Sequence, residues 1–238
     1  MQGARRKITK KELKEDKLVT YYYKTRTFLD KHGKAVIYYI AGFVALIIIV
    51  GLVINSKIQA NKAAGYQLYQ SQVLIDRSEY QEAVNSLNLL IDTYPGTRNS
   101  TSALVTLART YYQMAEYDST IQIADRYIVK YRGKSSILTC TALALKAAAL
   151  EQKAEFKSAA EMYAQAAHSY PDLYTAPIYL IDAGRCYNLS GEDDKAIEIY
   201  EEVLKYYSYS DELVNRANEQ LARAGGVAEE LALKLSLF

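Results

Sequence analysis

The sequence has 238 residues, half of them hydrophobic and 24% charged, with a net charge of +2, which predicts a packed globular protein rather than a disordered or collagen-like chain. With 11 Gly and 3 Pro, helices are favoured over many short strands and tight turns. Two Cys and two His are too few for a disulfide-rich scaffold or a four-ligand zinc site, so we expect no enzymatic activity, no cofactor and no small-molecule substrate.

The N-terminal segment, residues 1–34, is basic and is predicted to be cytoplasmic. It carries eleven Lys and Arg against four acidic residues, a charge of +7, whereas the remaining 204 residues carry −5. Residues 10–31 have the pattern of an amphipathic helix. Its apolar residues are Leu13, Val19, Tyr22, Tyr23, Phe28 and Leu29. Two interpretations of the lysines stay open: binding to anionic lipid headgroups, or the ordinary basic flank of a membrane span.

Residues 35–54 are predicted to form one transmembrane helix in the lipid bilayer. These twenty residues carry no charge, and at about 1.5 Å per residue they span a hydrocarbon core of about 30 Å. Tyr38 and Tyr39 lie where an aromatic belt is expected. A wholly apolar core helix is usually shorter, and a cleavable signal peptide begins earlier in the chain.

The charge distribution also predicts the orientation of the span. Basic flanks stay in the cytoplasm, which places residues 55–238 outside it, in the periplasm if the membrane is a bacterial inner membrane. No Cys lies near the N-terminus, so we expect no lipoprotein anchor. Residues 55–63 contain no Pro or Gly. We therefore expect this connector to carry the spanning helix unbroken into a first repeat helix that ends near Arg77.

Four similar segments follow, and they begin at Ser78, Ala115, Ala154 and Gly191. The third residues of the segments are separated by 37, 39 and 37 positions, and they are Tyr80, Tyr117, Phe156 and Asp193. Each is followed fourteen positions later by a tyrosine, namely Tyr94, Tyr131, Tyr170 and Tyr207. A fixed internal distance with a slightly variable period predicts one structural unit copied four times, with length changes confined to loops.

Each unit is predicted to contain two helices, of which the segments above form the second. First helices include the runs from Ser102 and from Ala176. Small residues recur where the paired helices must approach closely, at Ala83, Ala108, Ala147, Ala159, Gly184 and Ala196. Pro95 and Pro171 follow second helices. Because neither helix can bury its apolar face alone, we predict an all-α solenoid over residues 64–224.

The repeats resemble the tetratricopeptide repeat. The small–aromatic–small–Pro pattern of that family appears as Ala147, Phe156, Ala159 and Pro171, and less completely as Gly184, Tyr187, Ala196 and Tyr200. The match covers about residues 64–211 but lacks the usual Trp, and its period is longer than the family's ~34 residues. A last helix, residues 211–223, would cap the solenoid, and Gly225 and Gly226 would end it. The predicted architecture is thus a single transmembrane helix, about four helix-turn-helix repeats and a C-terminal capping helix.

The resemblance implies a concave groove, lined by first helices, that binds protein or peptide partners. Transferred to this chain, the groove positions are Leu68, Gln72, Ile75, Val105, Arg109, Tyr112, Ala144, Ala148, Glu151, Ile178, Ile181, Arg185 and Asn188. The family's Lys/Asn carboxylate clamp is disfavoured because these positions hold no Lys. Arg109 and Arg185 either hold a partner's carboxylate or are ordinary surface arginines. A nucleic-acid partner is not expected because the repeat domain is acidic.

The remaining His, Cys and Asn residues that could act in catalysis or be modified each have a structural explanation as well. His168, at the end of a second helix, is expected to interact with the helix dipole rather than to act as a base. Cys140 and Cys186 are expected to be unpaired, mostly buried thiols. Asn99 and Asn188 begin glycosylation triplets, which also occur by chance.

The whole layout resembles the ancillary subunit family of the bacterial Sec translocon. The lead-in over residues 17–34, KLVTYYYKTRTFLDKHGK, carries the likeness together with the single span and the repeats. The resemblance implies a membrane-tethered adaptor near the translocon exit that works with translocon subunits, periplasmic chaperones and emerging clients. The alternative is a structural scaffold of a secretion, gliding or envelope-assembly machine. The hydrophobic tail, residues 225–238, is expected either to cover the last repeat or to add to a partner's sheet edge.

Overall fold

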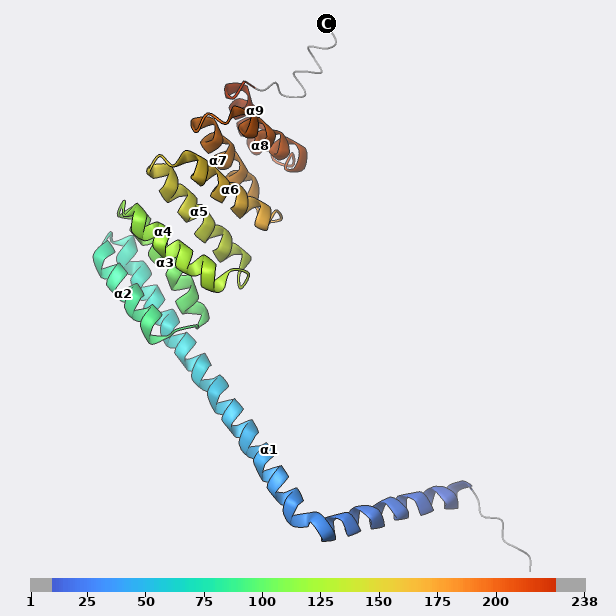
Figure 1. The fold of residues 1–238 in the computed structure, drawn as a ribbon. Coiled ribbons are helices and arrows are strands. Elements are labelled where there is room, and N and C mark those ends of the chain that lie inside the picture. The colour runs from blue at the N-terminus through green and yellow to red at the C-terminus, as the bar shows by residue number, and fades with distance from the viewer. Residues whose placement is uncertain (1–9, 226–238) are drawn as a thin grey trace, which may run out of the picture. The chain divides into compact units, whose positions relative to one another are not determined.

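In a computed structural model of the chain, residues 10–225 are described, and they form helices joined by short turns, without a strand in that range (Figure 1). The helices are α1 (Lys10–Asp76), α2 (Tyr80–Thr93), α3 (Arg98–Gln113), α4 (Tyr117–Tyr131), α5 (Ser136–Gln152), α6 (Phe156–Ser169), α7 (Ala176–Leu189), α8 (Asp193–Tyr206) and α9 (Asp211–Arg223). The chain divides into two compact units, residues 1–58 and residues 59–238. The roles predicted for the C-terminal tail fall on residues 226–238, outside the described part.

Helix α1 contains the predicted membrane span. It runs without interruption from Lys10 to Asp76, so the chain stays helical through residues 55–63, as the lack of Pro and Gly predicted. The large apolar side chains between Ile37 and Ile54 are all exposed. Its most apolar window has no buried residue. Length, composition and exposure are compatible with a single-pass membrane anchor.

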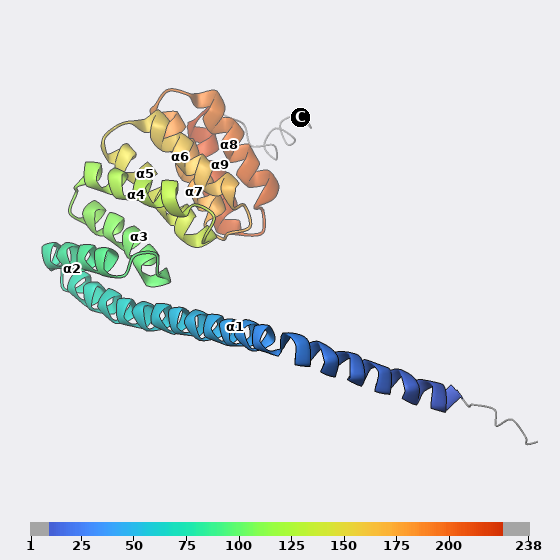
Figure 2. The same cartoon turned by 60° about the horizontal axis from the view of Figure 1, so that its bottom comes forward.

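The second unit is a stack of helix pairs (Figures 1 and 2). The four residues predicted to be equivalent, Tyr80, Tyr117, Phe156 and Asp193, are the first residues of α2, α4, α6 and α8. Helices α4, α6 and α8 each pack with the helix before them, and α9 follows α8 over the predicted residues. Helix α2 contacts α1 through hydrogen bonds of Gln67 and Ser71 with Ser86. Gly225, at a φ of 83°, follows α9 in the left-handed region, as expected of a residue that ends a helix. The predicted solenoid is therefore confirmed.

The turn inside each pair has the same backbone geometry. The residue two positions before each second helix has a positive φ, and these residues are Ser78, Ala115, Ala154 and Gly191. After α5, for example, Glu155 N–H donates to the Leu150 carbonyl at 2.9 Å, and Ala154 N–H donates to the Glu151 carbonyl at 2.9 Å. This is the Schellman arrangement, which satisfies the last carbonyls of a helix. Only one of the four positions is glycine.

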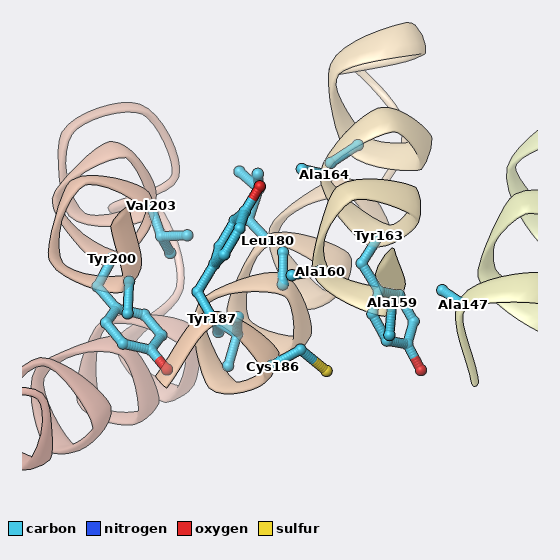
Figure 3. Close-up of a cluster of buried hydrophobic side chains, with 14 of the residues drawn as sticks. Ala147, Ala159, Ala160, Tyr163, Ala164, Leu180, Cys186, Tyr187, Tyr200 and Val203 are labelled. Carbon is cyan, nitrogen blue, oxygen red and sulfur yellow. The ribbon is translucent and has the colours of Figure 1, made fainter. Parts of the chain in front are cut away.

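The core lies between the helices of each pair and between successive pairs. The small residues predicted at helix contacts are buried, and five of them, Ala83, Ala108, Ala147, Ala159 and Ala196, are 0% exposed. Gly184 on α7 packs so closely on Tyr200 of α8 that a Cβ there would lie 2.5 Å from the Tyr200 ring. Figure 3 shows part of this cluster, in which Tyr200 and Cys186 come from neighbouring helices.

Candidate partner-binding surface

The residues predicted to line the groove lie on α1, α3, α5 and α7, but they differ in depth. Ile75, Val105, Ala144 and Ile181 are buried in the hydrophobic core, and Leu68 and Ala148 are partly buried against it. Gln72 and Arg109 are exposed. The half-buried positions are Tyr112, Glu151, Ile178, Arg185 and Asn188. The apolar members of the predicted set are therefore mostly buried, and the part that a partner can reach is more polar than the set as a whole.

The centre of this surface is an acid–arginine cluster, made of Glu151 on α5 with Asp182 and Arg185 on α7. Arg185 donates from Nη1 to Glu151 Oε1 at 2.7 Å and from Nη2 to Glu151 Oε2 at 2.9 Å, a bidentate pair. Arg185 Nη2 also donates to Asp182 Oδ1 at 3.4 Å. The Arg185 guanidinium is thus already paired with a carboxylate of its own chain, and this favours the structural interpretation of Arg185.

Two further side chains reach Glu151 from the neighbouring helices. Tyr163 on α6 donates its hydroxyl to Glu151 Oε2 at 3.4 Å, and the Cys186 thiol lies 3.6 Å from the same oxygen. The cluster therefore joins α5, α6 and α7 across the boundary between two repeats. Since buried or half-buried charges must be paired to be tolerated, it also fixes the register of these helices.

The titration behaviour of the cluster follows from its contacts. The hydrogen bonds from Arg185 lower the pKa of Glu151, whereas burial raises the pKa of Asp182 above its ordinary value of 3.8. Burial raises the pKa of the Cys186 thiol to about 12, so the thiol is protonated at neutral pH and is a poor nucleophile. Within residues 10–225, no three or more His, Cys, Asp or Glu side chains are placed to hold a metal ion.

Arg109 offers a different kind of contact from Arg185. It is exposed on α3, and within the described residues it has no hydrogen bond or ion pair to another side chain. Burial raises the pKa of Tyr179 on α7, and the charge of Arg109 acts in the opposite sense. Tyr179 in turn stacks on Tyr163, with ring centroids 6.3 Å apart. Arg109 is therefore an exposed cation whose charge is felt by Tyr179 of an aromatic pair.

Tyr112 extends the surface on α3. Its ring contacts Tyr117, with centroids 5.8 Å apart. Burial raises the pKa of Tyr112, and the negative charge of Glu151 adds to the rise. The structure thus brings Tyr112, Glu151 and Arg185 from three successive first helices into one row. Sequence reasoning missed Asp182, Tyr163 and Tyr179, although Asp182 lies three residues before Arg185, a spacing at which helical side chains meet.

The His, Cys and Asn residues considered for catalysis or modification make contacts within the fold or are buried in it. His168, in the last turn of α6, lies 3.0 Å from Glu202 on α8. Cys140 and Cys186 are both free and buried, as predicted. The Asn99 side chain donates to the Asn61 carbonyl at 2.7 Å, so its amide is already engaged.

Comparison with known proteins supports the repeat assignment. A family model described as an outer membrane lipoprotein, YfiO, matches residues 60–172, and a tetratricopeptide repeat model matches residues 180–208. Comparison with curated proteins gave no match.

Several solved structures share the fold at low sequence identity. A tetratricopeptide repeat protein from Parabacteroides merdae is 15% identical over 68% of this chain, with a TM-score of 0.57, and the match spans 59% of that protein. A putative kinesin light chain from Podospora anserina, with nearly identical repeats, is 16% identical over 69% of this chain and 86% of its own, with a TM-score of 0.56. A MamA RS-1 double mutant is 17% identical over 67% of this chain and 84% of its own, with a TM-score of 0.52. The helix pairs and these matches together identify the chain as a protein with tetratricopeptide-type repeats that follow one candidate apolar helix.

Proposed function

We propose that this chain is a membrane-anchored adaptor without catalytic activity, whose repeat domain binds protein partners outside the cytoplasm. The observation that carries the proposal is the exposed apolar stretch of α1, which leads without a break into the first repeat. Exposed apolar side chains all around a helix need a lipid or protein environment. The uncharged length of residues 35–54 matches a bilayer core.

The orientation follows from charge. Residues 1–34 carry +7 and the rest of the chain −5, so the basic end stays in the cytoplasm and the repeats lie on the other side. In a bacterial inner membrane this places residues 55–238 in the periplasm.

The surface along α3, α5 and α7 is the proposed binding face. It combines an unpaired cation, Arg109, with the aromatic side chains of Tyr112 and Tyr179. Aromatic and arginine side chains are enriched where protein interfaces are strongest. A peptide segment with an acidic group and an apolar side chain fits these contacts.

The class of partner rests on the lead-in over residues 17–34. Its likeness to the Sec ancillary subunit favours translocon subunits, periplasmic chaperones or emerging clients as partners. Anchoring beside the translocon would raise the local concentration of the binding face there. A permanent scaffold in an envelope machine is the alternative, and it would use the opposite, second-helix face.

Photocrosslinking in cells separates these alternatives. A photoreactive residue is placed at Arg109 or Tyr112 on α3, and at Val129 on α4, which is 88% exposed and serves as the control on a second helix. The adaptor predicts substoichiometric crosslinks to translocon, chaperone or client proteins from α3 and few from Val129. Stoichiometric crosslinks confined to Val129 would contradict it and support the scaffold.

A further inference from the structure

The part of α1 that precedes the apolar stretch has two chemically distinct faces. Residues three, four and seven positions apart share one side of a helix. One side therefore carries Tyr21, Tyr22, Thr25, Phe28, Leu29 and His32, which we call the aromatic face. Its large apolar side chains are exposed, with Tyr21 at 69% and Phe28 at 57%.

Contacts along the helix confirm this grouping. The rings of Phe28 and His32 stack with centroids 4.9 Å apart, so they lie on the same side of α1. Thr25 donates its hydroxyl to the Tyr21 carbonyl at 2.8 Å, so it presents its methyl group beside these rings rather than a free hydroxyl. The aromatic face therefore presents mostly ring and aliphatic surface, and its polar groups are the Tyr21 and Tyr22 hydroxyls and the His32 imidazole.

A basic stripe lies on another side of the same helix. Lys24, Lys31 and Lys34, with Thr27 between them, follow the spacing of three and four residues. An open hollow of about 500 Å³ runs along the helix here, and Lys24 and Lys31 line it together with Phe28 and His32. The hollow thus includes residues of the basic stripe and of the aromatic face, and Val19 and Tyr23 also line it.

We propose that residues 19–34 of α1 form an interfacial anchor that lies in the headgroup layer of an anionic bilayer, with the aromatic face toward the acyl chains and Lys24 and Lys31 on the phosphates. This inference rests on the proposed membrane span, because covalent continuity with residues 35–54 holds the segment at the bilayer surface. Figure 1 shows α1 bent between its N-terminal part and the stretch that leads to the repeats, so the segment can turn away from the direction of the span. A helix with aromatic residues on one side and lysines beside them is the pattern of interfacial helices. Anionic phospholipid is the partner that satisfies both faces, since lysines flanking an apolar surface attract negative headgroups.

The absence of Trp from the sequence allows a direct test in the full-length protein. Three single-tryptophan variants are reconstituted into vesicles of phosphatidylcholine with phosphatidylglycerol: Phe28→Trp on the aromatic face, Thr27→Trp on the basic stripe, and Ile47→Trp in the span. Quenching by lipids with brominated acyl chains reports the depth of each side chain. The proposal predicts strong quenching at positions 28 and 47 and weak quenching at 27.

The three readouts distinguish failure of the anchor from failure of the span. If position 47 is not quenched, the proposed membrane span is wrong, and the interfacial anchor, which depends on it, is wrong too. If position 47 is quenched but position 28 is no more quenched than position 27, the span stands and the interfacial anchor is wrong. Blue-shifted emission at position 28 without quenching would mean that a protein covers the aromatic face, which also overturns the proposal.

The lipid charge is tested separately in the Phe28→Trp background. Replacing Lys24 and Lys31 by Gln should weaken the binding of residues 19–34 to the lipid surface about fivefold for each lysine removed. Quenching should therefore fall. The matched control removes the same charge from the repeat domain, through Lys130→Gln with Lys205→Gln, and should leave quenching unchanged. An unchanged signal in the Lys24 and Lys31 variant would contradict the role of the headgroups.

Discussion

Gly184 illustrates how a single side chain sets the distance between two helices. The nearest Tyr200 ring carbon would lie 2.5 Å from a Cβ at this position, and Tyr200 is itself 0% exposed, so the ring has no room to move away. The sequence marked Gly184 as a small residue at a helix contact, and the structure supplies the reason that even Ala is too large.

Gly184→Ala should lower the free energy of unfolding by about 1–3 kcal/mol through overpacking of α7 against α8. Urea unfolding of the full chain in detergent measures this change in the free energy of unfolding. In a Tyr200→Leu background the same substitution should cost less, because the clashing ring is gone. Equal costs in the two backgrounds would show that the contact with Tyr200 is not the cause.

The residues of positive φ that precede the second helices give a second prediction at the scale of single residues. Ala154 has a φ of 60° and is exposed, so its methyl group adds strain without adding packing. Ala154→Gly should raise the free energy of unfolding by up to about 1 kcal/mol, and Gly191→Ala, at the equivalent position, should lower it by a similar amount. Thermal unfolding checks both, and a lower melting temperature for Ala154→Gly would contradict the turn assignment.

Asp182 gives a prediction about pH. A carboxyl group whose pKa is higher in the folded chain stabilises the fold when protonated, and this contribution is lost as the pH rises from 3.8 through the folded pKa. Asp182→Asn should therefore melt higher than the parent chain at neutral pH, with the difference vanishing below pH 3.8. Melting curves across this pH range test it, and a variant that is less stable at neutral pH would show that the ionised carboxylate is needed.

At the scale of elements, an asparagine pair joins α1 to the start of α3. Asn99 N–H donates to Asn61 Oδ1 at 3.1 Å, and the Asn99 side-chain amide donates to the Asn61 carbonyl at 2.7 Å. Gly65 leaves room for this contact, because a Cβ there would lie 2.9 Å from the Asn99 amide nitrogen. The first repeat is thus tied to the second by polar contacts as well as by the core.

Asn99→Ala should lower the free energy of unfolding by about 1 kcal/mol, since it removes the hydrogen bond from the Asn99 side-chain amide to the Asn61 carbonyl, whereas the bond from Asn99 N–H to Asn61 Oδ1 is kept. Asn85→Ala, at an exposed position on α2, is the control and should change it by less than about 0.5 kcal/mol. Urea titration of both variants compares them. A neutral Asn99→Ala would mean that the pair does not support the junction.

The helices could be predicted well because their signals are local. The repeat spacing predicted that Tyr80, Tyr117, Phe156 and Asp193 are equivalent, and all four are the first residues of second helices. The lack of Pro and Gly predicted the continuity of α1. The burial of the predicted groove residues could not be predicted, because it depends on how the neighbouring repeats pack. Val105 and Ile181, for example, belong to the core rather than to an open groove. The pairing of Glu151 with Arg185 joins residues 34 positions apart and leaves no local signal.

At the scale of the whole molecule, an exposed apolar helix leads into a domain of tetratricopeptide-type repeats, a kind of repeat that binds protein partners. In the repeats, burial raises the pKa of the Cys186 thiol and Arg185 is paired with Glu151, so both side chains have structural contacts. In the proposed function, the apolar stretch over residues 35–54 holds the repeat domain at a membrane. The proposed function therefore depends on which side of the membrane the repeats occupy.

Protease digestion of intact spheroplasts, with an epitope tag at each end of the chain, tests this central claim most directly. The account predicts that external protease removes the C-terminal tag and cleaves the repeat domain, while the N-terminal tag survives on a membrane-bound fragment. A C-terminal tag that stays protected until the membrane is broken, with the N-terminal tag lost, would contradict it.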